Sequence, residues 1–188
     1  MYFGYEALKA GDWKRALEFY RTALRIWPDL PQKLVAFNYQ YGKLLLDMGR
    51  LDEAAVVFAR AAAMDPTSSV PHYNLGLIYG RWGKYRDSEA ALLKSLELNS
   101  EEPETYNTLS RLMIEVGRYN EAVSWAEKAI RRKPDFLWSH FNRAWALEKL
   151  GRLQEAKAGY ERVQALDPGL GEAAARLAHL RSLMARGS

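Results

Sequence analysis

Residues 72–98 read HYNLGLIYGRWGKYRDSEAALLKSLEL and contain two apolar patterns separated by a short turn. In the first pattern, Leu75, Ile78 and Trp82 recur at spacings of three and four residues, which places them on one face of a helix. Gly83 follows directly, and glycine allows the left-handed backbone conformation that ends many helices. The segment therefore predicts two helices joined by a tight turn at Gly83.

The markers of this segment recur along the whole chain. Glycines stand at intervals of 38, 34, 34 and 34 residues, and each is followed by a small residue and then by a closing residue that is proline in every unit but one. The glycines are Gly11, Gly49, Gly83, Gly117 and Gly151, the small residues are Ala16, Ala54, Ser88, Ala122 and Ala156, and the closing residues are Pro28, Pro66, Ser100, Pro134 and Pro168. Repetition at a fixed period of this length predicts a stack of similar two-helix units.

Each marker has a physical explanation. Proline lacks a backbone N–H and therefore marks the point where the second helix of a unit has ended. Small residues on two facing helices allow the helix axes to approach closely. The first helices carry Gly42, Gly76, Ser110 and Ala144, which we expect to face the small residues Ala54, Ser88, Ala122 and Ala156 of the second helices.

This order of large, small and proline positions resembles the tetratricopeptide repeat. The resemblance extends over nearly the whole chain and is closest in residues 72–98 and in residues 36–66, which read AFNYQYGKLLLDMGRLDEAAVVFARAAAMDP. It implies an all-α fold, a right-handed α-solenoid of antiparallel helix pairs known as the TPR superhelix. Three positions depart from the family pattern: Ser100 replaces a closing proline, Arg143 replaces a usual leucine, and Tyr5 stands where a small residue is expected.

The expected organisation is a single domain over residues 1–188 with about eleven helices and no strand. We place the repeats at about 1–30, with a short first helix, 31–68, 69–102, 103–136 and 137–170. Residues 171–186 are predicted to form a capping helix, because a solenoid needs a polar-backed helix to end in water. The longer first interval contains four extra residues, close to one helical turn, so we expect the helix from Pro31 to be one turn longer.

Composition excludes several classes of protein. Hydrophobic residues make up 48% of the chain and charged residues 27%, and the chain contains no cysteine, which excludes disulfides, thiolate catalysis and the common zinc sites. A net charge of +4 is only mildly basic, and we expect no nucleic-acid partner. No apolar run is long enough for a membrane span, and the first residues lack the pattern of a signal peptide. We therefore expect a cytoplasmic protein without membrane insertion.

No motif indicates catalysis, a metal or a cofactor. The three histidines, His72, His140 and His179, form no short ligand pair, and no glycine-rich phosphate loop is present. Ser110 and Ser139 lack the local context of a catalytic nucleophile. Acidic residues recur one place before the small residue of each second helix, where they favour the positive end of the helix dipole. These are Glu53, Asp87, Glu121 and Glu155.

The family resemblance also implies a place for a ligand. In tetratricopeptide arrays the first helices line a concave groove that commonly binds an extended peptide or a helix. Mapped residue by residue, the peptide-binding candidates of this chain are Tyr39, Lys43, Tyr73, Asn74, Asn107, Arg111, Trp138, Phe141, Asn142, Trp145 and Arg176. Tyr39, Tyr73, Phe141 and Trp145 are expected on the groove side, where aromatic residues give a large contact area at low entropy cost. Other aromatic residues fall on positions that normally pack between helices: Trp13, Tyr79, Tyr85 and Tyr119.

Two modes of peptide capture can be compared within this groove. Asn74 and Asn142 share one place in their units, with Gln40 there too, and resemble the asparagine ladder with which some relatives hold a peptide main chain. The lysine and arginine clamp of other relatives is disfavoured, because only Lys43 and Asn74 fit its places. The remaining places carry Tyr39, Glu104 and Thr108.

These observations predict a non-catalytic protein-interaction scaffold or adaptor that binds a peptide or helix of a partner protein in the concave groove. Two alternatives stay open: a self-assembling scaffold in which one copy meets another, and a regulatory fragment of a larger enzyme. The mass in solution would separate the first alternative, and the boundaries of the full gene would separate the second. RNA binding is a remote further alternative, because no basic stripe accompanies the repeats.

Overall fold

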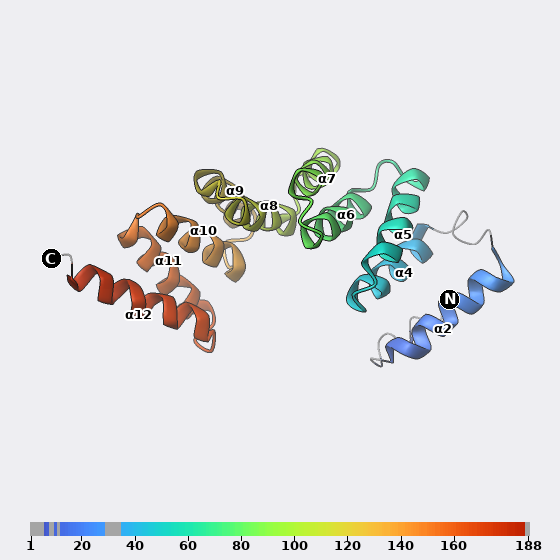
Figure 1. Cartoon of the computed structure of the whole chain (residues 1–188), viewed down its shortest axis with the longest axis horizontal. Coiled ribbons are helices and arrows are strands. Elements are labelled where there is room, and N and C mark those ends of the chain that lie inside the picture. Colours follow the sequence, from blue (N-terminus) through green and yellow to red (C-terminus); the bar gives the residue numbers. More distant parts are fainter. Residues whose placement is uncertain (1–5, 8–9, 11, 29–34, 187–188) are drawn as a thin grey trace. The chain divides into compact units, whose positions relative to one another are not determined.

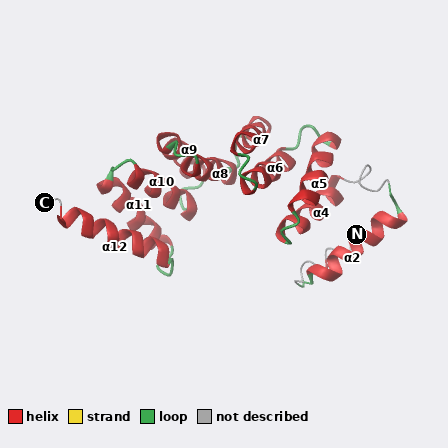
Figure 2. Cartoon of the chain, viewed as in Figure 1, coloured by secondary structure: helices red, strands yellow, loops and turns green. Residues whose placement is uncertain are grey.

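The computed structural model describes residues 6–7, 10, 12–28 and 35–186, and these residues form ten helices and no strand (Figures 1 and 2). The prediction of an all-α fold is thus confirmed for the part of the chain that is described. The expected first helix and the proposed extension of a helix from Pro31 fall largely on residues outside this part, so both stay predictions.

The helices alternate in length in step with the repeat. Those that begin a unit have 13 residues: α4 (Val35–Asp47), α6 (Ser69–Arg81), α8 (Pro103–Glu115) and α10 (Leu137–Lys149). Those that end a unit have 14: α2 (Trp13–Ile26), α5 (Leu51–Met64), α7 (Tyr85–Leu98), α9 (Tyr119–Arg132) and α11 (Leu153–Leu166). The last helix, α12, runs from Gly171 to Arg186. Every second helix ends two residues before the closing proline or Ser100, as the markers predict.

The turn inside each unit depends on its glycine. Gly49, Gly83, Gly117 and Gly151 have φ angles between 71° and 77°, the left-handed region that other residues rarely adopt. In the third of these turns, the Gly117 N–H donates to the Ile114 carbonyl and the Arg118 N–H donates to the Met113 carbonyl. This pair of bonds is the Schellman motif, which satisfies carbonyls at the end of a helix.

The helices form two compact units, each larger than one two-helix repeat. The first unit is residues 1–99 and the second unit is residues 100–188. In the first, α4 packs on α5 and α6 on α7, α5 joins the two pairs, and α2 contacts α4. Its core includes the rings of Tyr20, Phe37 and Tyr41, which contact one another. In the second, α8 packs on α9, α10 contacts α8, α9 and α11, and α12 covers α11. Each unit is therefore a stack of helix pairs of the α-solenoid type.

Small residues lie where the paired helices approach closely. A Cβ atom added to Gly76 of α6 would lie 2.6 Å from a carbon of Leu92 of α7, so a larger residue does not fit there without movement. In two repeats a buried serine hydroxyl links the paired helices, from the second helix to the first in one repeat and from the first helix to the second in the other. Ser88 Oγ of α7 donates to the Gly76 carbonyl at 2.7 Å, and Ser110 Oγ of α8 donates to the Ala122 carbonyl at 2.8 Å.

One expectation about the core is wrong. Tyr85 stands at the first position of α7 and is 39% exposed, so it is not buried between helices. Tyr79 and Tyr119 are partly buried, and the side chain of Trp13 lies outside the described atoms.

Candidate functional site

Amide side chains link α8 and α10, which are the first helices of two successive repeats in the second unit. The Asn142 Nδ2 group of α10 donates to Oδ1 of Asn107 on α8 at 2.9 Å, and the Ser139 hydroxyl donates to the same oxygen at 3.2 Å. Asn142 and Ser139 are both buried. These bonds fix the register of α10 against α8, and one turn farther along α8 stands Arg111, whose side chain is exposed.

A row of aromatic rings follows α10. The Phe141 ring lies edge-on to Trp138 at 6.0 Å, to Trp145 at 6.3 Å and to Tyr160 of α11 at 5.6 Å, measured between ring centroids. Phe141 is only 3% exposed, whereas Trp138 at one end of the row is 49% exposed. The row therefore continues from the core between α10 and α11 to the surface. We call Asn107 and Arg111 of α8 with Trp138 and Trp145 of α10 the α8–α10 surface, which the buried Asn142 supports from α10.

Arg176 connects the capping helix to this row. Its guanidinium carbon lies 4.7 Å from the centroid of the Trp145 ring and 5.9 Å from that of Phe141. One of its nitrogens, Nη1, lies 3.3 Å from Oε2 of Glu148, and the same oxygen accepts a hydrogen bond from the Tyr160 hydroxyl at 2.8 Å. Burial, followed by this bond and the charge of Glu148, raises the pKa of Tyr160, so the phenol stays a neutral donor.

The corresponding positions of the first unit are more varied. Tyr39 of α4 and Tyr73 of α6 are half-buried, and Lys43 of α4 is exposed. Asn74 of α6 is buried, and its amide N–H donates to the Val70 carbonyl of its own helix at 2.9 Å.

The structure thus assigns different surroundings to the sequence-predicted residues. Arg111, Lys43 and Trp138 are exposed to solvent. Phe141 is a core residue that supports its neighbours, and the amides of Asn74 and Asn142 each already donate a bond inside the protein. Their use as a ladder for a peptide main chain stays a prediction, as does the whole peptide-binding set.

Glu148 and Tyr160 belong to the site and were missed by sequence reasoning. Tyr160 is fully buried in α11, and the Glu148 side chain is 17% exposed. Neither residue lies on a groove position of the repeat, so only the packing of α10, α11 and α12 in space reveals them.

Comparison with known proteins identifies the family of these helix pairs. Models described as tetratricopeptide repeats match residues 7–75, 71–102, 104–133 and 138–170, which together cover most of the chain. The chain belongs to the tetratricopeptide repeat family.

Similar proteins share this fold. Protein FlbA of Caulobacter vibrioides is 27% identical over an alignment of 160 residues that covers 81% of this chain, and the chain spans about a quarter of the length of that relative. The crystal structure of MamA has 23% identity and a TM-score of 0.77, covering 92% of this chain and 98% of MamA. The structure of YrrB, described as a TPR protein with an unusual peptide-binding site, has 17% identity and a TM-score of 0.70, covering 88% and 83% of the two chains.

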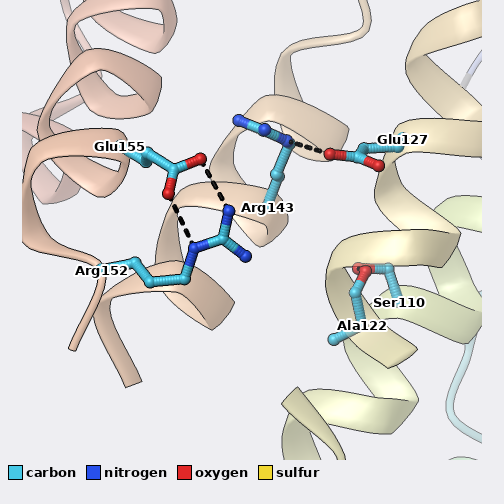
Figure 3. Close-up of polar contacts among 6 residues, drawn as sticks. All are labelled: Ser110, Ala122, Glu127, Arg143, Arg152 and Glu155. Atoms are coloured by element: carbon cyan, nitrogen blue, oxygen red, sulfur yellow. Dashed lines mark hydrogen bonds and ion pairs between the residues drawn. The ribbon is translucent and has the colours of Figure 1, made fainter. Parts of the chain in front are cut away.

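Ion pairs recur at the start of the second helices of this tetratricopeptide repeat protein. Figure 3 shows the pair of the last repeat, in which Arg152 donates to both carboxylate oxygens of Glu155 at 2.7 and 2.8 Å. Arg118 and Glu121 repeat the arrangement, and the Arg50 Nε group donates to Glu53 at 2.6 Å. The acidic residues therefore lie in the first helical turn, as predicted, but each of these three also has an arginine partner that sequence reasoning missed.

Two departures from the family pattern have structural partners. The Arg143 Nε group reaches from α10 to Oε1 of Glu127 on α9 at 3.0 Å (Figure 3). Ser100, in place of a closing proline, presents a backbone carbonyl that accepts a bond from Arg132 Nε at 2.6 Å. Arg143 therefore replaces an apolar position with a polar link inside the second unit, whereas the carbonyl at position 100 would be available in a proline as well.

Three further chemistry-bearing residues have structural contacts. The hydroxyls of Ser110 and Ser139 both take part in the hydrogen bonds described above, and His140 Nε2 lies 2.8 Å from the Pro134 carbonyl. Over the described ranges, no three residues of the metal-binding types come together. None of the described helices is both long and apolar enough to cross a membrane.

Proposed function

We propose that this chain is a protein-interaction scaffold whose α8–α10 surface binds a segment of a partner protein. The observation that carries the proposal is the placement of Trp138. Its ring is half-exposed, and it packs against the edge-on ring of the buried Phe141. A rigid aromatic residue of this kind buries a large area on binding and loses little side-chain entropy.

The rest of the α8–α10 surface suits a segment of mixed character. Arg111 is exposed, so its guanidinium group can pair with an acidic group of the partner. Trp145 offers a second aromatic contact on the same helix. Tyr39, Lys43, Tyr73 and Asn74 hold the equivalent positions in the first unit, and we propose that they contact a partner in the same manner.

The proposed interaction involves no catalytic step, cofactor or metal. It agrees with the fold shared with YrrB, whose structure is described by its peptide-binding site. That the partner is a protein rather than a nucleic acid stays part of the proposal, as does a cytoplasmic location.

Site-specific photo-crosslinking tests the proposal. An aromatic photo-crosslinking amino acid, which keeps a ring at the position, replaces Trp138 in one variant and Trp125 of α9 in a matched control, since Trp125 is also a partly exposed tryptophan of the second unit. We expect a partner to crosslink through position 138 and not through position 125. Crosslinking only through position 125 would contradict the proposal, and recovery of a second copy of this chain would favour the self-assembling scaffold.

A further inference from the structure

The contacts of Arg176 resemble those of a bound ligand. Its guanidinium group lies over the Trp145 ring and against the Glu148 carboxylate, and the Tyr160 hydroxyl of α11 donates to the same carboxylate oxygen. The aromatic face and the carboxylate therefore come from α10 and the supporting hydroxyl from α11. The capping helix α12 contributes the guanidinium, together with Glu172, whose Oε1 lies 3.5 Å from Arg176 Nε.

The chemistry of this arrangement is selective for a guanidinium group. A planar guanidinium can stack on an aromatic face and pair with a carboxylate at the same time, whereas an ammonium group acts as a compact, strongly hydrated point charge. The Glu148 side chain is 17% exposed, and a carboxylate with so little solvent is costly without a positively charged partner. The site formed by α10 and α11 thus favours a cation at the place of Arg176.

Arg176 can leave this site without unfolding α12. Its side chain is 25% exposed, and it already contacts Glu172 on the outer side of its own helix. Three other residues of α12, Ala173, Leu177 and Leu180, are almost fully buried and keep the helix in place. A change of the Arg176 rotamer alone would therefore vacate the ring of Trp145.

We propose that Trp145, Phe141 and Glu148 form a guanidinium-binding site that Arg176 occupies within the chain and that an arginine of a partner segment occupies in its place on binding. The part of this proposal that concerns a partner rests on the proposed function, because Trp145 belongs to the α8–α10 surface. The guanidinium site itself does not depend on it. Arg176 thereby acts as an internal competitor that restricts this surface to partners with a suitably placed arginine.

The test uses ethylguanidinium as the probe and the full chain with Arg176→Ala, which empties the site and retains a strong helix former. The readout is the NMR signal of the Trp145 indole N–H, a buried group without a hydrogen-bond partner among the described side chains. We expect a saturable shift in Arg176→Ala, and a response at least about tenfold weaker in the wild-type protein, where the probe competes with the resident arginine. Ethylammonium should bind Arg176→Ala more weakly than ethylguanidinium.

Matched variants make the result decisive. Glu148→Gln combined with Arg176→Ala should abolish the shift, because the carboxylate is lost while the ring of Trp145 stays. Equal responses in the wild-type protein and Arg176→Ala, or an undiminished response in the double variant, would overturn the proposal. If circular dichroism shows that Arg176→Ala loses helix, Arg176→Gln replaces it under the same criteria. If the probe binds as expected but Trp138→Ala leaves the affinity for the partner unchanged, the guanidinium site is supported and the proposed function is contradicted.

Discussion

At the scale of single residues, the turn glycines are under the strictest backbone constraint. Gly117 has a φ of 77°, and a Cβ added to it would meet no atom within 4 Å, so only backbone strain opposes a side chain there. We expect Gly117→Ala to lower the free energy of unfolding by about 1–2 kcal/mol. Urea denaturation of Gly171→Ala provides the control, because Gly171 has equal space and no positive φ. Equal midpoints for the two variants would show that the left-handed turn is not strained by alanine.

A second prediction concerns close packing of paired helices. Ala122 is fully buried in α9, and its carbonyl accepts the bond from Ser110 of α8. Ala122→Leu should therefore destabilise the protein by roughly 1–3 kcal/mol through overpacking. A denaturation midpoint and slope that both match the wild-type protein would show that this position tolerates a larger side chain.

The residue scale also shows where sequence reasoning stops. The left-handed turns were predictable because one glycine conformation explains each of them locally. The roles of Phe141 and Arg176 were not, since the family pattern assigns both to the groove. Phe141 is buried because the Trp138, Trp145 and Tyr160 rings surround it. Arg176 is ion-paired because Glu148 lies 28 positions earlier in the chain, a separation at which no helical spacing links two residues.

At the scale of helices, one ion pair replaces an apolar contact. Leu75 and Leu109 hold the position that Arg143 takes in the last repeat, and both leucines are buried. Because Glu127 is 41% exposed, it can return to water when its partner is removed. We expect Arg143→Leu to change stability by less than about 1 kcal/mol in either direction, while Arg143→Ala should be the less stable of the two because it leaves unfilled space. A large loss in Arg143→Leu, measured by thermal denaturation, would assign the pair a larger structural role.

Helix boundaries were the most predictable feature at this scale. Each second helix ends two residues before its closing residue, even where Ser100 replaces proline, because the repeat length and the Gly turn already limit the helix. The partners across helices were less predictable. Arg118 and Glu121 are three residues apart at the start of α9, a spacing that can be read from the sequence. The pair of Arg143 and Glu127, in contrast, requires that α9 and α10 lie side by side.

At the scale of the whole molecule, the repeats predict a purely helical protein. The described helices cover most of the chain, and no strand occurs among the described residues (Figure 2). We expect the circular dichroism spectrum to show helix without appreciable strand. A substantial strand signal would require that residues outside the described ranges form a sheet or that the repeats do not fold as helix pairs.

The central claim is that a partner protein binds the α8–α10 surface, and its most direct test is the affinity of a captured partner for two tryptophan variants. Trp138 is the better choice for truncation, because Trp145→Ala would also disturb Phe141 and Arg176. Trp138→Ala should weaken binding by about 2 kcal/mol or more with unchanged helix content, whereas the control Trp125→Ala should leave the affinity unchanged. An affinity that survives Trp138→Ala and falls in Trp125→Ala would place the partner on the surface of α9 and contradict this account.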